Sequence, residues 1–202
     1  MGAQAYRIIE DYVEFLYGSV VEIGSDRGEG STLFLSKFCK ENNLKFYSVD
    51  FEKEAYETAC STPFTITCNC TGEEFLKEFN DDKKICFTYL DNFDYIYDVL
   101  YKSPQGRQLI EKQKKVYKDY NVDLNNENSQ LAHLIQSQHI EKLSTETSFI
   151  LFDDTWMNKD GFFEGKGGTA IPFLINKGYT ILRQNESNAE KWESFILVSR
   201  GK

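Results

Sequence analysis

The sequence is poor in the features that mark several large classes of protein. Its 23 lysine and arginine residues are outnumbered by 32 aspartate and glutamate residues, which gives a formal net charge of −9. That excess of acid argues against a nucleic-acid partner, because no basic footprint offsets the phosphates. No apolar run approaches the length of a membrane span, and we recognise no targeting segment. We therefore expect a cytoplasmic protein without a membrane partner.

Cysteine and histidine are too few and too scattered for the familiar metal sites. The five cysteines are an odd number, and Cys68 and Cys70 lack a second pair of ligands, so we interpret all five as reduced thiols. The two histidines, His133 and His139, are six residues apart and do not share one face of a helix. His133 is the candidate general base, since imidazole titrates near neutral pH, and the alternative is a packing residue.

The composition is that of a globular protein, with 41% hydrophobic and 15% aromatic residues in a chain of 202. This length predicts one domain, residues 1–202, with a substantial core. Hydrophobic patterns that alternate between the two periodicities predict an α/β fold. Strands are expected at 20–23, 45–49, 63–68, 84–90, 148–152, 179–183 and 194–199, and helices at 3–17, 32–41, 53–60, 71–79, 129–143 and 169–176.

The stretch 20–32 organises the rest of the chain. Its β-branched residues predict a buried strand, and Gly24, Gly28 and Gly30 then form a turn that a ligand can approach closely. Ser31 or Thr32 can cap the following helix, whose N-terminus favours a polar or negatively charged ligand end. The spacing matches neither the dinucleotide fingerprint nor the phosphate loop, which would need a lysine. The alternative is a tight turn that binds nothing.

Acidic residues follow several of the predicted strands. Asp50 ends the second strand, about twenty residues after the glycine turn, where a carboxylate can accept hydrogen bonds from a ribose; the alternative is a helix N-cap. Asp91 follows the fourth strand, and Asp153 and Asp154 follow the fifth. Because adjacent parallel strands converge at their carboxyl ends, we expect these three carboxylates to lie together. A cation should neutralise them, unless Asp154 caps the next segment and Asp91 faces solvent.

The segment 95–147 interrupts the alternation. It shows no strand pattern and is long enough for two or three helices, with a loop expected at Asn121–Ser129. A helix should follow with Leu131, Leu134, Ile135 and Ile140 on its apolar side. We interpret the segment as an insertion that covers the mouth of the site and selects the substrate. A structural or dimerisation element is the alternative.

The combination of Glu22, the three glycines and Ser31 resembles motif I of class I S-adenosylmethionine-dependent methyltransferases. The resemblance spans about residues 18–200 and implies a Rossmann-like seven-stranded sheet, mostly parallel with an antiparallel hairpin strand at its end. The acids at 91 and 153–154 make the chain similar to metal-dependent O-methyltransferases of the catechol and macrolide-sugar kinds, and to cephalosporin-hydroxylase-like proteins. Where the catechol type carries a lysine base, this chain has Asp94.

This resemblance implies S-adenosylmethionine as cofactor and O-methylation of a small molecule or sugar, in a possible homodimer. It implies a metal ion, Mg²⁺ with Mn²⁺ or Ca²⁺ as substitutes, on Asp91, Asp153 and Asp154. Asn69 or Thr71 would contact the adenine, although Thr71 can equally cap the next helix. The alternatives are a hydroxylase-like or other metal-dependent enzyme on the same fold, and a binding domain without catalysis. The expected cofactor contacts are Glu22, Gly24, Ser25, Gly28, Gly30, Ser31, Asp50, Phe51, Asn69 and Asp91.

Overall fold

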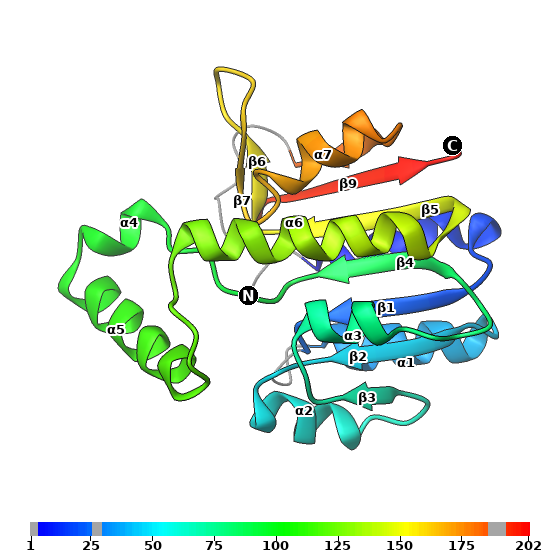
Figure 1. Ribbon diagram of the computed structural model, residues 1–202, viewed down its shortest axis with the longest axis horizontal. Coiled ribbons are helices and arrows are strands. Elements are labelled where there is room, and N and C mark those ends of the chain that lie inside the picture. The colour runs from blue at the N-terminus through cyan, green and yellow to red at the C-terminus, as the bar shows by residue number, and fades with distance from the viewer. Residues whose placement is uncertain (1–3, 26–29, 186–192) are drawn as a thin grey trace.

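A computed structural model of the chain describes residues 4–25, 30–185 and 193–202 and contains a seven-stranded sheet (Figure 1). Five neighbouring strands are parallel, and the sixth in spatial order is antiparallel to both of its neighbours. The predicted Rossmann-like methyltransferase sheet is therefore confirmed. The spatial order is β3 (Ile66–Cys68), β2 (Lys45–Val49), β1 (Ser19–Ile23), β4 (Ile85–Leu90), β5 (Ser144–Asp153), β9 (Phe195–Arg200) and β8 (Thr180–Gln184).

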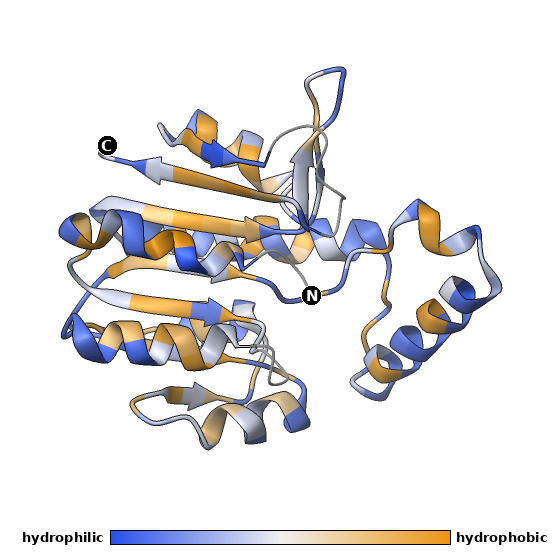
Figure 2. Ribbon diagram, turned by 180° about the vertical axis from the view of Figure 1, so that it is seen from behind, coloured by the Kyte–Doolittle hydropathy of each residue, from blue (hydrophilic) through white to orange (hydrophobic). Residues whose placement is uncertain are grey.

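Helices cover both faces of this sheet, which is why its central strands are buried throughout. One core joins η1 (Ala5–Phe15) and α1 (Ser31–Glu41) to the sheet through residues such as Ile9 and Leu35. The other core joins α3 (Gly72–Glu78) and α7 (Ala170–Asn176) to the opposite face through Leu76 and Leu174. Figure 2 shows the apolar residues concentrated on the strands between these layers. The helix α2 (Lys53–Cys60) follows β2.

The insertion contains three helices, α4 (Asp98–Tyr101), α5 (Pro104–Asp119) and α6 (Asn126–Leu143). The first two project beyond the carboxyl ends of the parallel strands, and α6 lies across the sheet (Figure 1). A small core of its own, built on Ile96, Ile110, Tyr117 and Leu124, holds α4 and α5 together and also contacts Phe51. The helices agree with the prediction, but α6 begins three residues before the predicted Ser129 and shortens the expected loop.

The predicted orientation of α6 is wrong. Leu131 is 52% exposed, and Leu134 and Ile135 are only partly buried, whereas Ile140 is fully buried as expected. The face that packs against the sheet instead carries Ser129, Ala132, His133, Gln136 and Ser137, all of them buried. The apolar pattern predicted the wrong face because polar side chains occupy the buried one.

Further differences concern the types and bounds of elements. The first helix is a 3₁₀-helix, and the third strand begins at Ile66 rather than at Pro63. The strand β5 begins at Ser144, four residues before the predicted start and inside the segment expected to have no strand. The expected flexible loop at 161–169 contains one strand of a hairpin, β6 (Thr155–Met157) with β7 (Phe163–Gly165). No helix within the described ranges is long and apolar enough to cross a membrane.

Candidate functional site

The turn between β1 and α1 is fixed by a buried carboxylate. Glu22 is fully buried and accepts hydrogen bonds from the hydroxyl groups of Ser31 at 2.6 Å, Thr32 at 2.7 Å and Ser48 at 2.7 Å. These contacts tie the start of α1 to β1 and β2. The sequence predicted Glu22 and Ser31 as ligand contacts, whereas this structural role of both side chains was not foreseen. The N-cap of α1 is Gly30, so the prediction that Ser31 or Thr32 caps this helix is wrong, because both hydroxyls bind Glu22 instead.

Gly24 and Gly30 have the positive φ angles, +94° and +118°, that favour glycine. At Gly24 a second constraint applies, because a Cβ atom there would lie 2.5 Å from the backbone nitrogen of Asn92. The end of β1 therefore lies against the loop after β4 with no room for a side chain at position 24. Gly28, the other predicted glycine contact, lies outside the described residues.

Asp50 lies at the end of β2 and faces this turn. Its Oδ2 atom accepts a hydrogen bond from the backbone nitrogen of Ser25 at 2.8 Å, and its Oδ1 atom accepts one from the nitrogen of Glu52 at 2.7 Å. The N-cap of α2 is Glu52, so the capping interpretation of Asp50 is wrong. The side chain of Asn69 donates to the carbonyl oxygens of Asp50 and Phe51, at 2.9 and 3.1 Å, and so holds the loop after β2 in place.

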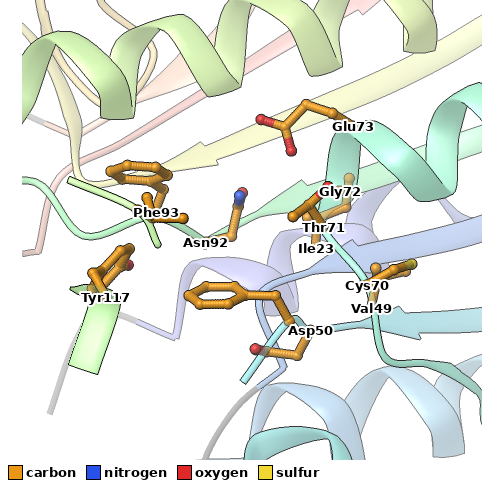
Figure 3. Close-up of a pocket in the computed structure, with 12 residues that line it drawn as sticks. Ile23, Val49, Asp50, Cys70, Thr71, Gly72, Glu73, Asn92, Phe93 and Tyr117 are labelled. Carbon is orange, nitrogen blue, oxygen red and sulfur yellow. The ribbon is translucent and has the colours of Figure 1, made fainter. Parts of the chain in front are cut away.

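A cavity of about 240 Å³ opens between these loops (Figure 3). Thr71, in its wall, caps α3 in a reciprocal capping box with Glu74, which confirms the capping interpretation of Thr71. The insertion supplies Tyr117, whose ring packs 5.5 Å from that of Phe51 and whose hydroxyl accepts the Asp94 backbone N–H at 2.8 Å. The cavity is lined by Ile23, Val49, Asp50, Phe51, Cys70, Thr71, Gly72, Glu73, Asn92, Phe93, Tyr117 and Val122.

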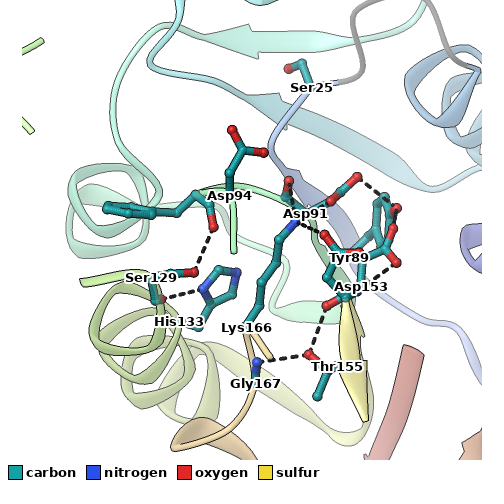
Figure 4. A network of polar contacts seen from close by, with 12 residues as sticks. Ser25, Tyr89, Asp91, Asp94, Ser129, His133, Asp153, Thr155, Lys166 and Gly167 are labelled. Carbon is teal, nitrogen blue, oxygen red and sulfur yellow. Dashed lines mark hydrogen bonds and ion pairs between the residues drawn. The ribbon is translucent and has the colours of Figure 1, made fainter. Parts of the chain in front are cut away.

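A second group of polar side chains lies beside this cavity, at the ends of β4 and β5 (Figure 4). Lys166 reaches it from the residue after β7, and its side chain is only 2% exposed. Its Nζ atom lies 2.6 Å from Oδ1 of Asp91 and 3.0 Å from Oδ2 of Asp154. Burial alone would lower the pKa of Lys166, but the carboxylates of Asp154 and Asp91 outweigh it and raise that pKa well above its ordinary value. The lysine is therefore charged.

Tyr89 connects the remaining acid to this group. Its hydroxyl lies 2.6 Å from Oδ2 of Asp153 and 3.1 Å from Oδ2 of Asp91. The hydroxyl has one proton, which it donates to Asp153 over the shorter of the two distances. Burial, with the negative charges of Asp91 and Asp154, raises the pKa of Asp153 well above its usual range. Burial also raises the pKa of Asp91.

These contacts do not fit a metal ion on the three acids. Lys166 already lies between Asp91 and Asp154, and Asp153 is engaged with Tyr89. Within the described part of the chain, no group of three histidine, cysteine, aspartate or glutamate residues could hold a metal. The carboxylates do lie together, as predicted, but the cation among them is not the expected metal ion and offsets only part of their charge. That cation is a lysine side chain.

The buried face of α6 completes the site. His133 is fully buried, and its Nδ1 atom lies 2.7 Å from the carbonyl oxygen of Ser129, so Nδ1 carries the proton. The Nε2 atom has no hydrogen-bond partner, and burial lowers the pKa of His133 to about 3. The ring is uncharged at neutral pH and offers a lone pair on Nε2. His139 is only partly buried on the same helix.

Two amide side chains share this lack of partners. Among the described residues, the Oδ1 atom of Asn92 is buried without a partner, and the carbonyl oxygen of Gln136 is unpaired, whereas its amino group lies toward the carboxylate of Glu73. A Cβ atom on Gly72 would lie 2.9 Å from Nε2 of Gln136, which places that amide against the cavity wall. Unpaired buried polar groups are costly and rare in folded proteins, so they indicate where a ligand binds.

Sequence reasoning missed three members of this site, Tyr89, Gln136 and Lys166. Tyr89 follows the buried pattern of its strand, and Gln136 lies on what the apolar pattern made the outer face of α6. Lys166 lies between glycines in a segment that we expected to be a loop. The signal that could have found Lys166 was the set of acids at 91, 153 and 154, because three carboxylates that lie together need a positive charge nearby.

Searches for similar sequences found no matching family model and no matching curated protein. Solved structures of the same fold include a candidate methyltransferase from Streptococcus mutans in complex with S-adenosylhomocysteine, at a TM-score of 0.57 and 11% identity over 98% of this chain and 99% of that one. The N-methyltransferase NodS from Bradyrhizobium japonicum WM9, in complex with the same ligand, gives 0.53 and 12% over 97% and 84%. An rRNA methylase from Streptococcus thermophilus gives 0.52 and 14% over 99% and 98%.

Proposed function

We propose that this protein is an S-adenosylmethionine-dependent methyltransferase that acts on a small molecule. The observation that carries the proposal is the cavity at the carboxyl ends of β1, β2 and β4, with Gly24 against Asn92 and Asp50 in its wall. Ligands of doubly wound sheets bind at this edge. Two structures of the same fold hold S-adenosylhomocysteine, which supports the choice of cofactor.

The residues of the cavity fit that cofactor. Asp50 would accept hydrogen bonds from the ribose hydroxyls, and the rings of Phe51 and Phe93 would contact the flat base. The orphaned Oδ1 atom of Asn92 would accept a hydrogen bond from the ligand. When bound, the cofactor supplies a methyl group on a positively charged sulfur. Asp91 lies directly before Asn92 and, through Lys166, fixes the polar group beside the cavity.

Replacing Asp50 by alanine should weaken the binding of S-adenosylhomocysteine by about 10- to 100-fold, the usual effect of losing a charged hydrogen bond. Titration calorimetry measures this directly. The matched control is Glu57→Ala, an exposed acid on α2 whose side chain is 62% accessible, and it should bind normally. Unchanged affinity in Asp50→Ala would contradict the ribose contact. Binding of NAD or ATP in place of S-adenosylhomocysteine would overturn the cofactor assignment itself.

Metal-assisted O-methylation, the finer prediction from the sequence, has a separate test. Because Lys166 already neutralises Asp91 and Asp154, we expect protein stripped with a chelator to retain both ligand binding and methyl transfer. Transfer to catechols and sugars would be followed before and after chelation, and again after Mg²⁺ is restored. Activity that disappears with chelator and returns with Mg²⁺ would reinstate the metal mechanism, including its hydroxylase-like variant.

A binding domain without catalysis is less well supported. A module that only binds a ligand does not need a buried lysine, a buried aspartate and a buried histidine at the edge of its cavity, since each is costly to bury. Strained or unsatisfied groups of this kind are concentrated at reactive sites.

A further inference from the structure

The polar groups left unpaired beside the cavity define a chemical preference. His133 offers a lone pair on Nε2, and Gln136 offers its carbonyl oxygen, while its amino group lies toward Glu73. Acceptors therefore outnumber donors in the wall that a ligand would contact. A group rich in N–H donors satisfies such a wall, whereas a carboxylate or a phosphate would leave it unpaired.

The charges beside this wall favour the same class of ligand. Lys166 is one cation in contact with two carboxylates, Asp91 and Asp154. Asp94, on the loop after β4, adds a third carboxylate, and no hydrogen bond or ion pair of its side chain occurs among the described residues. Figure 4 shows Lys166 beside the ring of His133, which is itself fully buried, and Asp94 on the loop above them with its carboxylate directed away from the ring. The excess of negative charge attracts a cationic ligand and repels an anionic one.

An aromatic wall continues from this group. The rings of Tyr97 and Trp156 are stacked at 5.9 Å, and Tyr95 meets both of them edge-on at 5.8 and 5.7 Å. Burial and the nearby carboxylate of Asp154 raise the pKa of Tyr97 above its ordinary value, so its ring remains neutral beside the acid. Aromatic faces next to carboxylates are a favourable environment for an ammonium group.

We infer that the acceptor of methyl transfer is an amine, methylated on nitrogen, that binds between His133, Asp94 and this aromatic wall. The inference rests on the proposed function and specifies its substrate. An amine reaches the site as an ammonium ion and first loses one proton to water. The nitrogen lone pair then forms the new N–C bond while the C–S bond breaks and its electron pair remains on sulfur. The positive charge passes to nitrogen, next to Asp94.

The same groups are poorly suited to a hydroxyl acceptor. An alcohol must lose its proton as it attacks, which requires a base with a pKa near the working pH. Burial holds the pKa of His133 at about 3, and the neighbouring carboxylates keep Lys166 protonated. A neutral amine needs no such base during the attack. His133 then acts through Nε2 as a hydrogen-bond acceptor that orients one N–H bond and with it the lone pair.

The decisive experiment offers both nucleophiles in matched compounds. Tyramine carries an amine and a phenol, tyrosol has a hydroxyl in place of the amine, and glucosamine and glucose form a second pair. Methyl transfer from S-adenosylmethionine would be measured for each compound, and NMR of the product would locate the methyl group. We expect tyramine or glucosamine to be methylated on nitrogen, with tyrosol and glucose inert.

A charge variant tests the binding site independently. Asp94→Asn should raise KM for the amine about tenfold, as expected for one lost charge pair near the surface, and leave kcat within about threefold. Asp119→Asn, an exposed acid at the end of α5, is the control and should change neither. The affinity for S-adenosylhomocysteine should be unchanged in both variants, because that ligand carries no sulfonium charge.

The outcomes separate the two proposals. Methylation on oxygen overturns the inference, and so does normal binding of S-adenosylhomocysteine with no amine bound or methylated. A loss of affinity for S-adenosylmethionine alone in Asp94→Asn, with KM for the amine unchanged, also overturns it, because Asp94 would then serve the cofactor. Failure of S-adenosylhomocysteine to bind at all instead refutes the proposed function.

Discussion

Replacement of Lys166 by methionine is expected to lower the free energy of unfolding by about 3–5 kcal/mol, the typical cost of removing one partner of a buried ion pair. Methionine has nearly the same shape, so the packing is preserved and the effect isolates the charge. Asp91 and Asp154 would then lie together without a cation. Urea denaturation followed by circular dichroism measures the loss.

The control is Lys159→Met, an exposed lysine on the loop of the same hairpin, which should unfold like the parent protein. A second variant identifies the cause. Adding Asp154→Asn to Lys166→Met removes one of the two uncompensated charges and should recover part of the lost stability. If Lys166→Met is as stable as the parent, or if the second substitution lowers stability further, the buried ion pair does not have the role assigned to it.

Replacement of Gly24 by alanine should lower the affinity for S-adenosylhomocysteine by about 100-fold, an effect typical of a shift of about 1 Å in a binding site. The added Cβ atom would lie 2.5 Å from the nitrogen of Asn92, so the loop that lines the cavity must move. The same overlap should destabilise the fold by about 1–3 kcal/mol beyond the strain of a positive φ angle. Calorimetry and urea denaturation give the two quantities.

Gly178 offers a control that separates strain from overlap. Its φ angle is +86°, close to the +94° of Gly24, but a Cβ atom there would meet nothing within 4 Å. Gly178→Ala should therefore show only the cost of the backbone conformation, about 1–3 kcal/mol, with unchanged ligand affinity. Equal effects of the two substitutions on binding would show that the close approach of β1 to the β4 loop is unimportant.

The sequence correctly predicted the elements in which the hydrophobic residues of the local pattern are also the residues buried in the fold. The strand 45–49 and the helix 53–60 have the predicted bounds, because alternation and turn residues mark them clearly. The carboxyl ends of β4 and β5 converged as the parallel arrangement requires, so the acids at 91, 153 and 154 could be placed together in advance.

The remaining features depend on contacts that no local pattern encodes. The buried face of α6 carries His133 and Gln136, and a pattern of apolar residues therefore predicted its outer face instead. Lys166 follows a short hairpin, and it contacts Asp91, which lies 75 positions earlier in the chain. A rule that assigns lysine to solvent fails where convergent carboxylates need a counter-charge.

The position of Lys166 also determines where the positive charge of the site comes from. A neutralising ion taken from solution is held only in proportion to its concentration, and it competes with every other ion of similar size and charge. Here the positive charge belongs to a side chain, so each molecule has one. The pairing of β6 with β7 places residue 166 next to Asp154, where its backbone N–H donates to the Asp154 carbonyl oxygen. The β6–β7 hairpin therefore supplies the positive charge of the site from the chain itself.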